Sequence, residues 1–128
     1  MARRLLIVDD DLPVAELIER VAQRQGFDTL VARDPARFAE VWQAFDPDII
    51  LLDIVMPELD GIALLHQLAA AECRARVILI SGSDPYLLEC GQRLGQAYGL
   101  QSVQCLHKPI GLSELRSSLA AGGEGTPD

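Results

Sequence analysis

Short apolar runs alternate along the chain with longer segments in which apolar residues recur every three or four positions. We expect each run to form a β-strand. The five predicted strands cover residues 5–8, 29–32, 49–52, 77–80 and 103–106. The first, third and fourth runs are almost continuously apolar, which is typical of parallel strands that helices cover on both faces.

The segments between the runs have the spacing of amphipathic helices. In the first segment, the i, i+3, i+4, i+7 pattern that defines one helical face is formed by Val14, Leu17, Ile18 and Val21. Further helices are predicted at residues 38–45, 61–71, 85–98 and 112–121. Asp34-Pro35 is expected to open the second helix, because aspartate caps free backbone N–H groups and proline fits the first turn.

Strands that alternate with helices in this way indicate an α/β fold, with one parallel sheet and helices on both faces. The length of 128 residues suits a single domain. We assign residues 1–121 to that domain and the glycine-rich residues 122–128 to a disordered tail or linker. In such sheets ligands bind at the carboxyl ends of the strands, so polar residues are expected where the apolar runs stop.

Polar residues do follow four of the five predicted strands. They are Asp9-Asp10-Asp11 after the first, Asp53 after the third, Ser81-Gly82 after the fourth and His107-Lys108-Pro109 after the fifth. The second strand, which such folds place at the margin of the sheet, ends in Ala32-Arg33. Carboxylates, a hydroxyl and an ammonium group are therefore expected together at one edge of the sheet.

Carboxylates crowded at one edge need positive charge beside them. Two unit charges about 4 Å apart repel by roughly 4 kcal/mol at an effective dielectric of 20, which is a large share of the net stability of a domain. Mg²⁺ suits such a site, because it binds carboxylate, carbonyl and phosphate oxygens. Lys108 supplies a second, compact positive charge that is suited to a phosphoryl oxygen.

Composition excludes several other classes of protein. The net charge of −8 argues against a direct nucleic-acid-binding surface, since phosphate contacts need clustered lysine and arginine. No apolar run is long enough for a signal peptide or for a membrane span of about 20 residues. Cys73, Cys90 and Cys105 lack the spacing of metal ligands. We expect reduced thiols in a cytoplasmic protein.

The run LLDIVMPELDG at residues 51–61 resembles the D-x-x-M-P-x-x-D-G signature of the receiver domains of two-component response regulators. The acidic pair Asp9-Asp10, the hydroxyl of Ser81 and the pair Lys108-Pro109 resemble the same family in the same order. The resemblance covers about residues 3–121. It implies a flavodoxin-like receiver fold with the strand order 2-1-3-4-5.

The resemblance implies that Asp53 accepts a phosphoryl group from a histidine kinase, a phosphotransfer protein or a small phosphodonor. Ser81 would hydrogen-bond the bound phosphoryl group, and Lys108 would pair with Asp53 or with its phosphate. The Lys108–Pro109 peptide bond would be cis, an isomer that is accessible because the second residue is proline. Phosphorylation would switch a face that binds an output domain or protein, and homodimer formation stays open.

The resemblance also implies a magnesium site. Asp10 and Asp53 would hold the ion together with the backbone carbonyl of Val55, and Asp9 would act partly through water. Phosphoryl transfer depends on positioning and on charge neutralisation more than on covalent machinery. The chemistry of this donor set agrees with that need.

Other polar and aromatic residues have simpler interpretations. Asp11 is predicted to face solvent, and Asp60 is predicted to cap the helix at residues 61–71. We expect His66 and His107 to be surface residues. Trp42 lies at helical spacing with other aromatic residues and is predicted to belong to the core, not to a cofactor site.

The sequence departs from the family pattern in two places. Many receivers have an aromatic residue three positions before the lysine, where this chain has Cys105, so a switch that swings an aromatic ring is not expected. Ser81 and Lys108 are 27 positions apart, a few more than the family usually has. The extra length is predicted around residues 95–102, and with it an unusual partner interface.

Two other functions compete with a phosphoacceptor. A receiver-like binding module that is never phosphorylated would not need the full set of Asp9, Asp10, Asp53, Ser81 and Lys108. A phosphatase or phosphotransferase would need a further acid/base carboxylate. The position two residues after Asp53 is Val55, which cannot activate water and is expected to slow hydrolysis. We therefore expect a signalling domain and not an enzyme.

Overall fold

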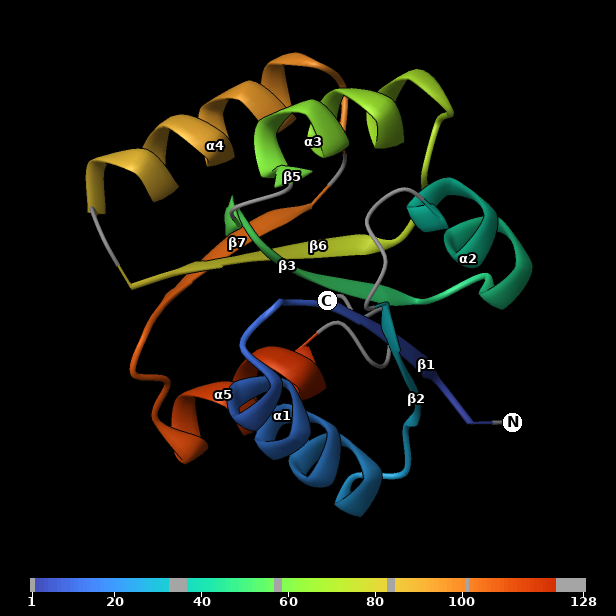
Figure 1. The fold of residues 1–128 in the computed structure, drawn as a ribbon, viewed down its shortest axis with the longest axis vertical. Coiled ribbons are helices and arrows are strands. Elements are labelled where there is room, and N and C mark those ends of the chain that lie inside the picture. Colours follow the sequence, from blue (N-terminus) through green and yellow to red (C-terminus); the bar gives the residue numbers. More distant parts are fainter. Residues whose placement is uncertain (1, 33–36, 57–58, 83–84, 101, 122–128) are drawn as a thin grey trace.

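A central parallel sheet lies between two layers of helices (Figure 1). The computed structural model describes residues 2–32, 37–56, 59–82, 85–100 and 102–121. The strands of this sheet, numbered 1 to 5 along the chain, follow the predicted order 2-1-3-4-5. The predicted α/β fold is confirmed.

All five predicted strands are present, and each is one or two residues longer than predicted. They are β1 (Arg4–Val8), β2 (Asp28–Ala32), β3 (Ile49–Asp53), β6 (Arg76–Ser81) and β7 (Val103–His107). Every residue of β3 is buried, and so is every residue of β1 and β6 after the first. The continuous apolar pattern of these strands reflects helices on both faces of the sheet.

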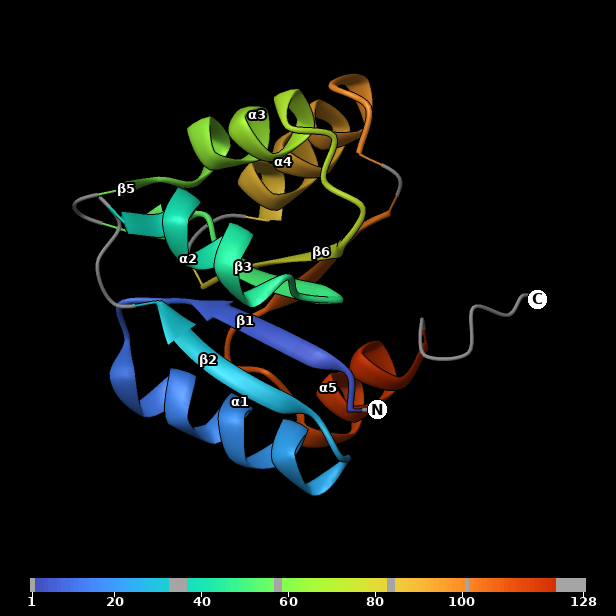
Figure 2. The same ribbon diagram turned by 90° about the vertical axis from the view of Figure 1, so that its right-hand side faces the viewer.

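Two groups of helices cover the sheet. The helices are α1 (Leu12–Arg24), α2 (Phe38–Phe45), α3 (Gly61–Ala70), α4 (Pro85–Ala97) and α5 (Leu112–Ala121). α1 and α5 lie on one face, and α2, α3 and α4 lie on the other (Figures 1 and 2). Within the described ranges, no helix combines the length and the apolar character that crossing a membrane requires.

The core consists of one apolar cluster on each face of the sheet. Neighbouring strand residues alternate between the two clusters, so that Leu6 and Ile50 face α2, α3 and α4, while Leu5 and Ile49 face α1 and α5. Trp42 is partly buried and packs against the first cluster, which confirms its predicted place in the core. Packing in these two clusters holds the strands in place, and the strands position the polar side chains at their carboxyl ends.

Leu17 corrects the predicted inner face of α1. The buried residues of this helix are Ala15, Ile18, Val21 and Ala22, whereas Leu17 is 45% exposed. Consecutive residues of a helix point about 100° apart, so Leu17 lies beside the buried stripe instead of within it. The spacing alone could not separate the centre of the stripe from its margin.

A short hairpin follows the end of β3 and was not predicted. β4 (Val55–Met56) and β5 (Leu59–Asp60) pair antiparallel just before α3 begins. Two-residue strands are too short to leave a periodic signal in the sequence. The Asp60 side chain, Asp34, Pro35 and residues 122–128, all of which carry predictions made above, lie outside the described part of the chain.

Candidate functional site

The carboxyl ends of four strands bring the predicted polar residues to one edge of the sheet. Asp9 follows β1, Asp53 ends β3, Ser81 ends β6 and Lys108 follows β7. The backbone N–H of Lys108 donates to the carbonyl of Ser81 at 3.0 Å, which joins the end of β7 to the end of β6. The parallel register therefore converts positions far apart in sequence into a single site.

Lys108 bridges two buried carboxylates. Its Nζ lies 3.0 Å from Oδ2 of Asp53 and 3.1 Å from Oδ2 of Asp9. Asp9 is 1% exposed and Asp53 is 4% exposed. Lys108 is the single lysine of the sequence. Because buried carboxylates are costly without a counter-charge, this ammonium group is a principal electrostatic support of the site.

One carboxylate oxygen of Asp9 is left without a hydrogen bond. Oδ1 accepts the backbone N–H of Asp11 at 2.9 Å. Oδ2 is buried and makes no hydrogen bond to any described residue, although Lys108 Nζ lies within ion-pair distance. Buried polar atoms nearly always have a partner. This oxygen is therefore a natural position for a ligand such as a cation.

Three carboxylates, that of Asp9 included, lie together at this edge of the sheet. Asp9, Asp10 and Asp53 each offer an oxygen, and these oxygens lie within 4.8 Å of one another. Mg²⁺ binds oxygens at about 2.0–2.1 Å and commonly retains several waters. Because the ion would have two buried ligands and one exposed ligand, part of its coordination shell would stay open to water or phosphate. The donor set fits the predicted ion.

Burial dominates the titration of Asp9. Burial raises its pKa from 3.8 to about 6, and the neighbouring charge of Asp53 adds to this rise, whereas the hydrogen bond from Asp11 and the interactions with Lys108 oppose it. For Lys108, burial alone would lower the pKa, but hydrogen bonds and charge interactions with Asp53 and Asp9 raise it overall. Lys108 therefore stays charged at neutral pH, and Asp9 takes up a proton in mild acid.

We expect Asp9→Asn to stabilise the cation-free protein at pH 8. A carboxyl group whose pKa is raised on folding contributes stability that is full below pH 3.8 and is lost as the pH rises through about 6. The full pKa shift of Asp9 corresponds to about 3 kcal/mol of folding free energy. The substitution also removes one charged partner of Lys108, and this loss offsets part of the gain in stability. In urea unfolding with EDTA, the free energy of unfolding of the variant should exceed that of the wild-type protein by about 1–3 kcal/mol at pH 8. The difference should be smaller at pH 5.

The control for this variant is Asp10→Asn, because Asp10 is an exposed carboxylate at the same edge. Its free energy of unfolding at pH 8 should differ from that of the wild-type protein by less than that of Asp9→Asn does. A wild-type minus Asp9→Asn difference that does not change with pH would contradict the buried, destabilised carboxylate.

Asp11 has a role that the sequence analysis missed. It is exposed, as predicted, but its Oδ1 also accepts the backbone N–H of Val14 at 3.4 Å and so caps α1. An aspartate just before a periodic apolar segment is a known signal for the start of a helix. The cap fixes where α1 begins, and the Asp11 N–H in turn orients the Asp9 carboxylate.

The remaining predicted residues are placed as follows. Ser81 is 1% exposed at the end of β6, and the Lys108–Pro109 bond is cis, as expected. His66 and His107 are exposed, as predicted. Val55 lies in β4, and a role for its carbonyl in metal binding stays a prediction.

Cys105 occupies the position that is aromatic in many receivers. Its thiol donates to the carbonyl of Leu88 at 3.5 Å, and burial raises the pKa of the thiol. A second side chain, Gln92, donates from Nε2 to the carbonyl of Val103 at 2.9 Å. These two contacts join α4 to β7 without any aromatic ring.

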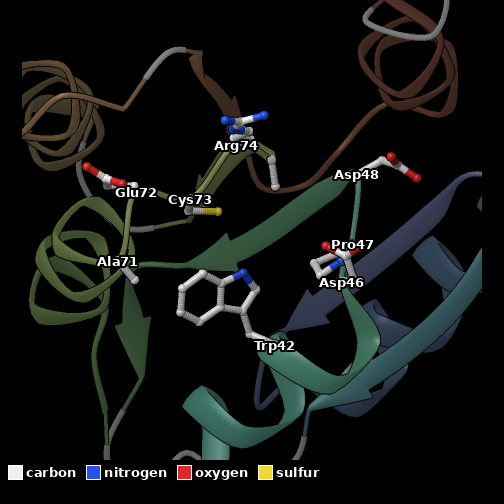
Figure 3. Close-up of a pocket in the computed structure, with 9 residues that line it drawn as sticks. Trp42, Asp46, Pro47, Asp48, Ala71, Glu72, Cys73 and Arg74 are labelled. Atoms are coloured by element: carbon white, nitrogen blue, oxygen red, sulfur yellow. The ribbon is translucent and has the colours of Figure 1, made fainter.

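A separate hollow of about 350 Å³ lies at the opposite edge of the sheet (Figure 3). Its walls come from the segments that precede β3 and β6, and Figure 3 shows the indole of Trp42 between them. Burial raises the pKa of the Cys73 thiol, and the Trp42 side chain partly offsets this rise. None of the predicted site residues lines this hollow, which separates it from the chemistry around Asp53.

Comparison with known proteins agrees with this geometry. The model of the family described as the response regulator receiver domain matches residues 5–120. The chain is 33% identical over 117 residues to protein-glutamate methylesterase/protein-glutamine glutaminase 3 of Rhodospirillum rubrum, covering 90% of this chain and 30% of that protein. It is 35% identical over 82 residues to the chemotaxis protein CheY of Bacillus subtilis, covering 63% of this chain and 68% of CheY.

Solved structures show the same likeness. The signal receiver domain of a response regulator from Bermanella marisrubri superposes with a TM-score of 0.77 at 26% identity, covering 94% of this chain and 98% of that one. A response regulator from Colwellia psychrerythraea gives a TM-score of 0.78 at 28% identity, covering 98% of this chain and all of that one. The chain therefore spans whole receiver domains but less than a third of the methylesterase.

Proposed function

The chain belongs to the family of response regulator receiver domains of two-component systems, and we propose that Asp53 accepts a phosphoryl group with Mg²⁺ bound beside it. The observation that carries this proposal is that Asp53 lies close to two kinds of group, further carboxylates and an ammonium. Asp9 and Asp10 offer carboxylate oxygens on one side, and the ammonium of Lys108 contacts Asp53 directly. This arrangement favours one nucleophilic carboxylate with positive charge around it.

The proposed transfer is a substitution at phosphorus. The carboxylate of Asp53 attacks the phosphorus atom, a new P–O bond forms, and the bond to the donor's leaving group breaks. The leaving group is a carboxylate for an acyl phosphate and an imidazole nitrogen for a phosphohistidine. When bound, Mg²⁺ would neutralise charge on the phosphoryl oxygens.

The chain's own residues would hold the reacting groups. Asp10, Asp53 and the Val55 carbonyl would bind the ion, and Asp9 would contact it partly through water. After the transfer, the ammonium of Lys108 would pair with a phosphoryl oxygen instead of with the Asp53 carboxylate. The hydroxyl of Ser81 would hydrogen-bond the same phosphoryl group. Charge-assisted hydrogen bonds of this kind contribute roughly 1.5–3 kcal/mol each.

Phosphorylation would act on a partner through the ends of β6 and β7. It adds about −1.5 to −2 charges beside Lys108, and the Lys108 backbone is bonded to Ser81. A Cβ added at Gly82 would lie 3.2 Å from Lys108 Cβ, so Lys108 packs closely against Gly82, the last described residue before α4. We propose that the responding face controls an output domain or a separate protein, and that the receiver itself is not an enzyme.

The test is a phosphorylation assay. Incubation with acetyl phosphate and Mg²⁺ should give one phosphoryl adduct by intact-protein mass spectrometry, and the adduct should be absent in Asp53→Ala and strongly reduced in EDTA. Asp11→Ala, which removes a neighbouring carboxylate that caps α1, is the matched control and should still form the adduct.

Each outcome of the assay separates the three candidate functions. A slow, single adduct that depends on Asp53 supports the phosphoacceptor. No adduct in the folded wild-type protein would favour a binding module. Rapid and continuous turnover of acetyl phosphate, measured by release of inorganic phosphate, would favour an enzyme.

A further inference from the structure

Two arginines contact the C-terminal end of α5. Arg3, which directly precedes β1, donates from Nη1 to the carbonyl of Leu119 at 3.1 Å. Arg76, the first residue of β6, donates from Nη1 to the carbonyl of Ser118 at 3.1 Å. The two accepting carbonyls belong to consecutive residues. Both guanidinium groups therefore lie at the edge of the sheet where the parallel strands begin, and Asp53 lies at the opposite edge, where they end.

These contacts help to hold the end of α5. The last four carbonyls of an α-helix have no partner within the helix, and in α5 they belong to residues 118–121. The two arginines therefore satisfy two of these four carbonyls. They also meet the negative end of the helix dipole, which is equivalent to about half an elementary charge. Two full positive charges thus face about half a negative charge, and most of the positive charge is not compensated by the helix.

Carboxylates do not supply the missing negative charge within the described part of the chain. None of the ion pairs seen there involves Arg3 or Arg76, although both side chains belong to partly buried residues. Burial lowers the pKa of Arg76, and the positive charge of Arg3 lowers it further. The two guanidinium groups therefore repel each other in a place where water screens charge only in part.

The pair has hydrogen-bond donors that α5 does not use. A guanidinium group carries five N–H donors and no acceptor. Besides its contact with Ser118, Arg76 donates from Nη2 to Oε1 of Gln104. Arg3 lies over the ring of Phe27, with its Cζ 4.8 Å from the ring centroid, and this contact uses the face of the guanidinium group and not its N–H donors. Several donors are therefore left for a ligand.

We propose that Arg3 and Arg76 form a binding site for an oxyanion, a phosphate group or a carboxylate. The planar guanidinium group binds the paired oxygens of such anions in a bidentate way. One bound anion would supply the negative charge that the end of α5 lacks, and it would relieve the repulsion between the two arginines. The side-chain N–H groups of Gln104, which make no hydrogen bond to a described residue, would add neutral donors beside the pair.

Capping of α5 alone is the simpler role for the two arginines. That role predicts a loss of stability when either arginine is replaced, but it predicts no affinity for anions. Anion affinity is therefore the property that separates the two roles. The proposal does not rest on phosphorylation of Asp53, because the two sites lie at opposite edges of the sheet.

The anion would come from one of two sources. A phosphate compound would bind from solution, or the chain would supply the carboxylate of Glu124. This residue is three positions beyond the last residue of α5 in the sequence, and three residues of chain span at most about 11 Å. Both sources share the same chemistry, and a variant of Glu124 distinguishes them.

The test is an NMR titration of the full chain with inorganic phosphate. EDTA removes divalent cations, and sodium chloride at matched ionic strength is the reference. We expect saturable shifts of the amide signals of Ser118, Leu119 and the first residues of β6 and β7. The signals of Asp53 and Ser81 should change no more than they do in sodium chloride.

Arg3→Gln and Arg76→Gln should each weaken phosphate binding by about tenfold or more, since a hydrogen bond to a charged group contributes at least that factor. Circular dichroism checks that each variant is folded. Arg3 precedes the first strand, so Arg3→Gln keeps the test decisive if Arg76→Gln fails to fold. The matched control is Arg74→Gln, which removes the same charge at an exposed arginine and should change binding by less than about twofold.

Glu124→Gln identifies the occupant of the site. If the Glu124 carboxylate binds the arginines, this variant should bind phosphate several-fold more tightly than the wild-type protein, because an internal competitor is removed. Equal affinity in the two proteins would assign the site to an anion from solution.

Two results would overturn the proposal. The first is the absence of saturable shifts at the end of α5 in both the wild-type protein and Glu124→Gln, which would leave Arg3 and Arg76 with the capping role alone. The second is an equal loss of phosphate binding in Arg3→Gln and Arg74→Gln, which would show that phosphate responds to the overall charge of the protein and not to this pair.

Discussion

Lys108→Met is expected to lower the free energy of unfolding by about 3–4 kcal/mol at pH 8 without divalent cations. The ammonium lies 3.0 Å from Asp53 and 3.1 Å from Asp9, both of which are almost completely buried. Removing one partner of a buried ion pair leaves an uncompensated charge, which typically costs about 3–5 kcal/mol. Methionine keeps a similar length and apolar stem, so the change isolates the charge. Urea unfolding monitored by circular dichroism measures it.

The dependence on conditions makes this result specific to the site. Protonation of Asp9 removes one of the two charges, so the loss should become smaller below the Asp9 pKa of about 6. Mg²⁺ should stabilise Lys108→Met more than the wild-type protein, because the ion would supply the missing positive charge. The double variant K108M/D9N should be more stable than the sum of the two single changes predicts.

Arg93→Met is the control for the loss of a positive side chain. Arg93 and Glu89 form an exposed pair at 3.7 Å, and such pairs contribute about 0–1 kcal/mol. If Lys108→Met cost no more than Arg93→Met at pH 8, the bridge between the two carboxylates would not support the fold.

Gly61→Ala is the second change for which a large effect is expected. A Cβ at residue 61 would lie 2.5 Å from the Cα of Ile54 and 3.0 Å from its Cβ. The first contact is with backbone that directly follows Asp53, so the chain cannot relieve it by turning a side chain. Overpacking of this kind typically costs about 1–3 kcal/mol, and a backbone obstacle places this case at about 3 kcal/mol. The midpoint temperature of thermal unfolding should fall by roughly 10 °C.

Gly111→Ala is the matched control, because Gly111 lies directly before α5 and Gly61 is the first residue of α3. A Cβ at residue 111 would meet its nearest heavy atom, Cβ of Glu114, at 3.9 Å, which is an ordinary contact. We expect less than about 1 kcal/mol of change there, as for most open surface positions. Equal stability losses in the two alanine variants would mean that the close approach of Gly61 to Ile54 does not constrain the segment after Asp53.

Most of the fold followed from local patterns. The strands β1, β3 and β6 could be predicted because each is apolar almost throughout, and that pattern arises when helices cover both faces of a sheet. The hairpin β4–β5 could not be predicted, because two-residue strands have no period. The assignment of Leu17 to the core was wrong. Helical spacing identifies the apolar stripe of α1, but it does not show how much of that stripe the sheet covers.

The site followed from a topological rule applied to those strands. Asp9, Asp53, Ser81 and Lys108 were predicted to meet because each ends or follows a parallel strand, and the structure places all four at one edge. The lack of a hydrogen bond at Asp9 Oδ2 could not be predicted, since it depends on where the Asp11 N–H and the Lys108 ammonium point.

The sequence by itself therefore determined the order of strands and helices, the edge at which the polar residues gather and the groups that gather there. These features depend on the spacing of apolar residues and on the order of elements along the chain, and both can be read directly from the sequence. Only the tertiary structure decided which carboxylate oxygen is buried without a hydrogen bond, which glycine lies against backbone and which leucine of α1 is exposed. Those features depend on the distances between elements, and packing between segments remote in sequence sets these distances.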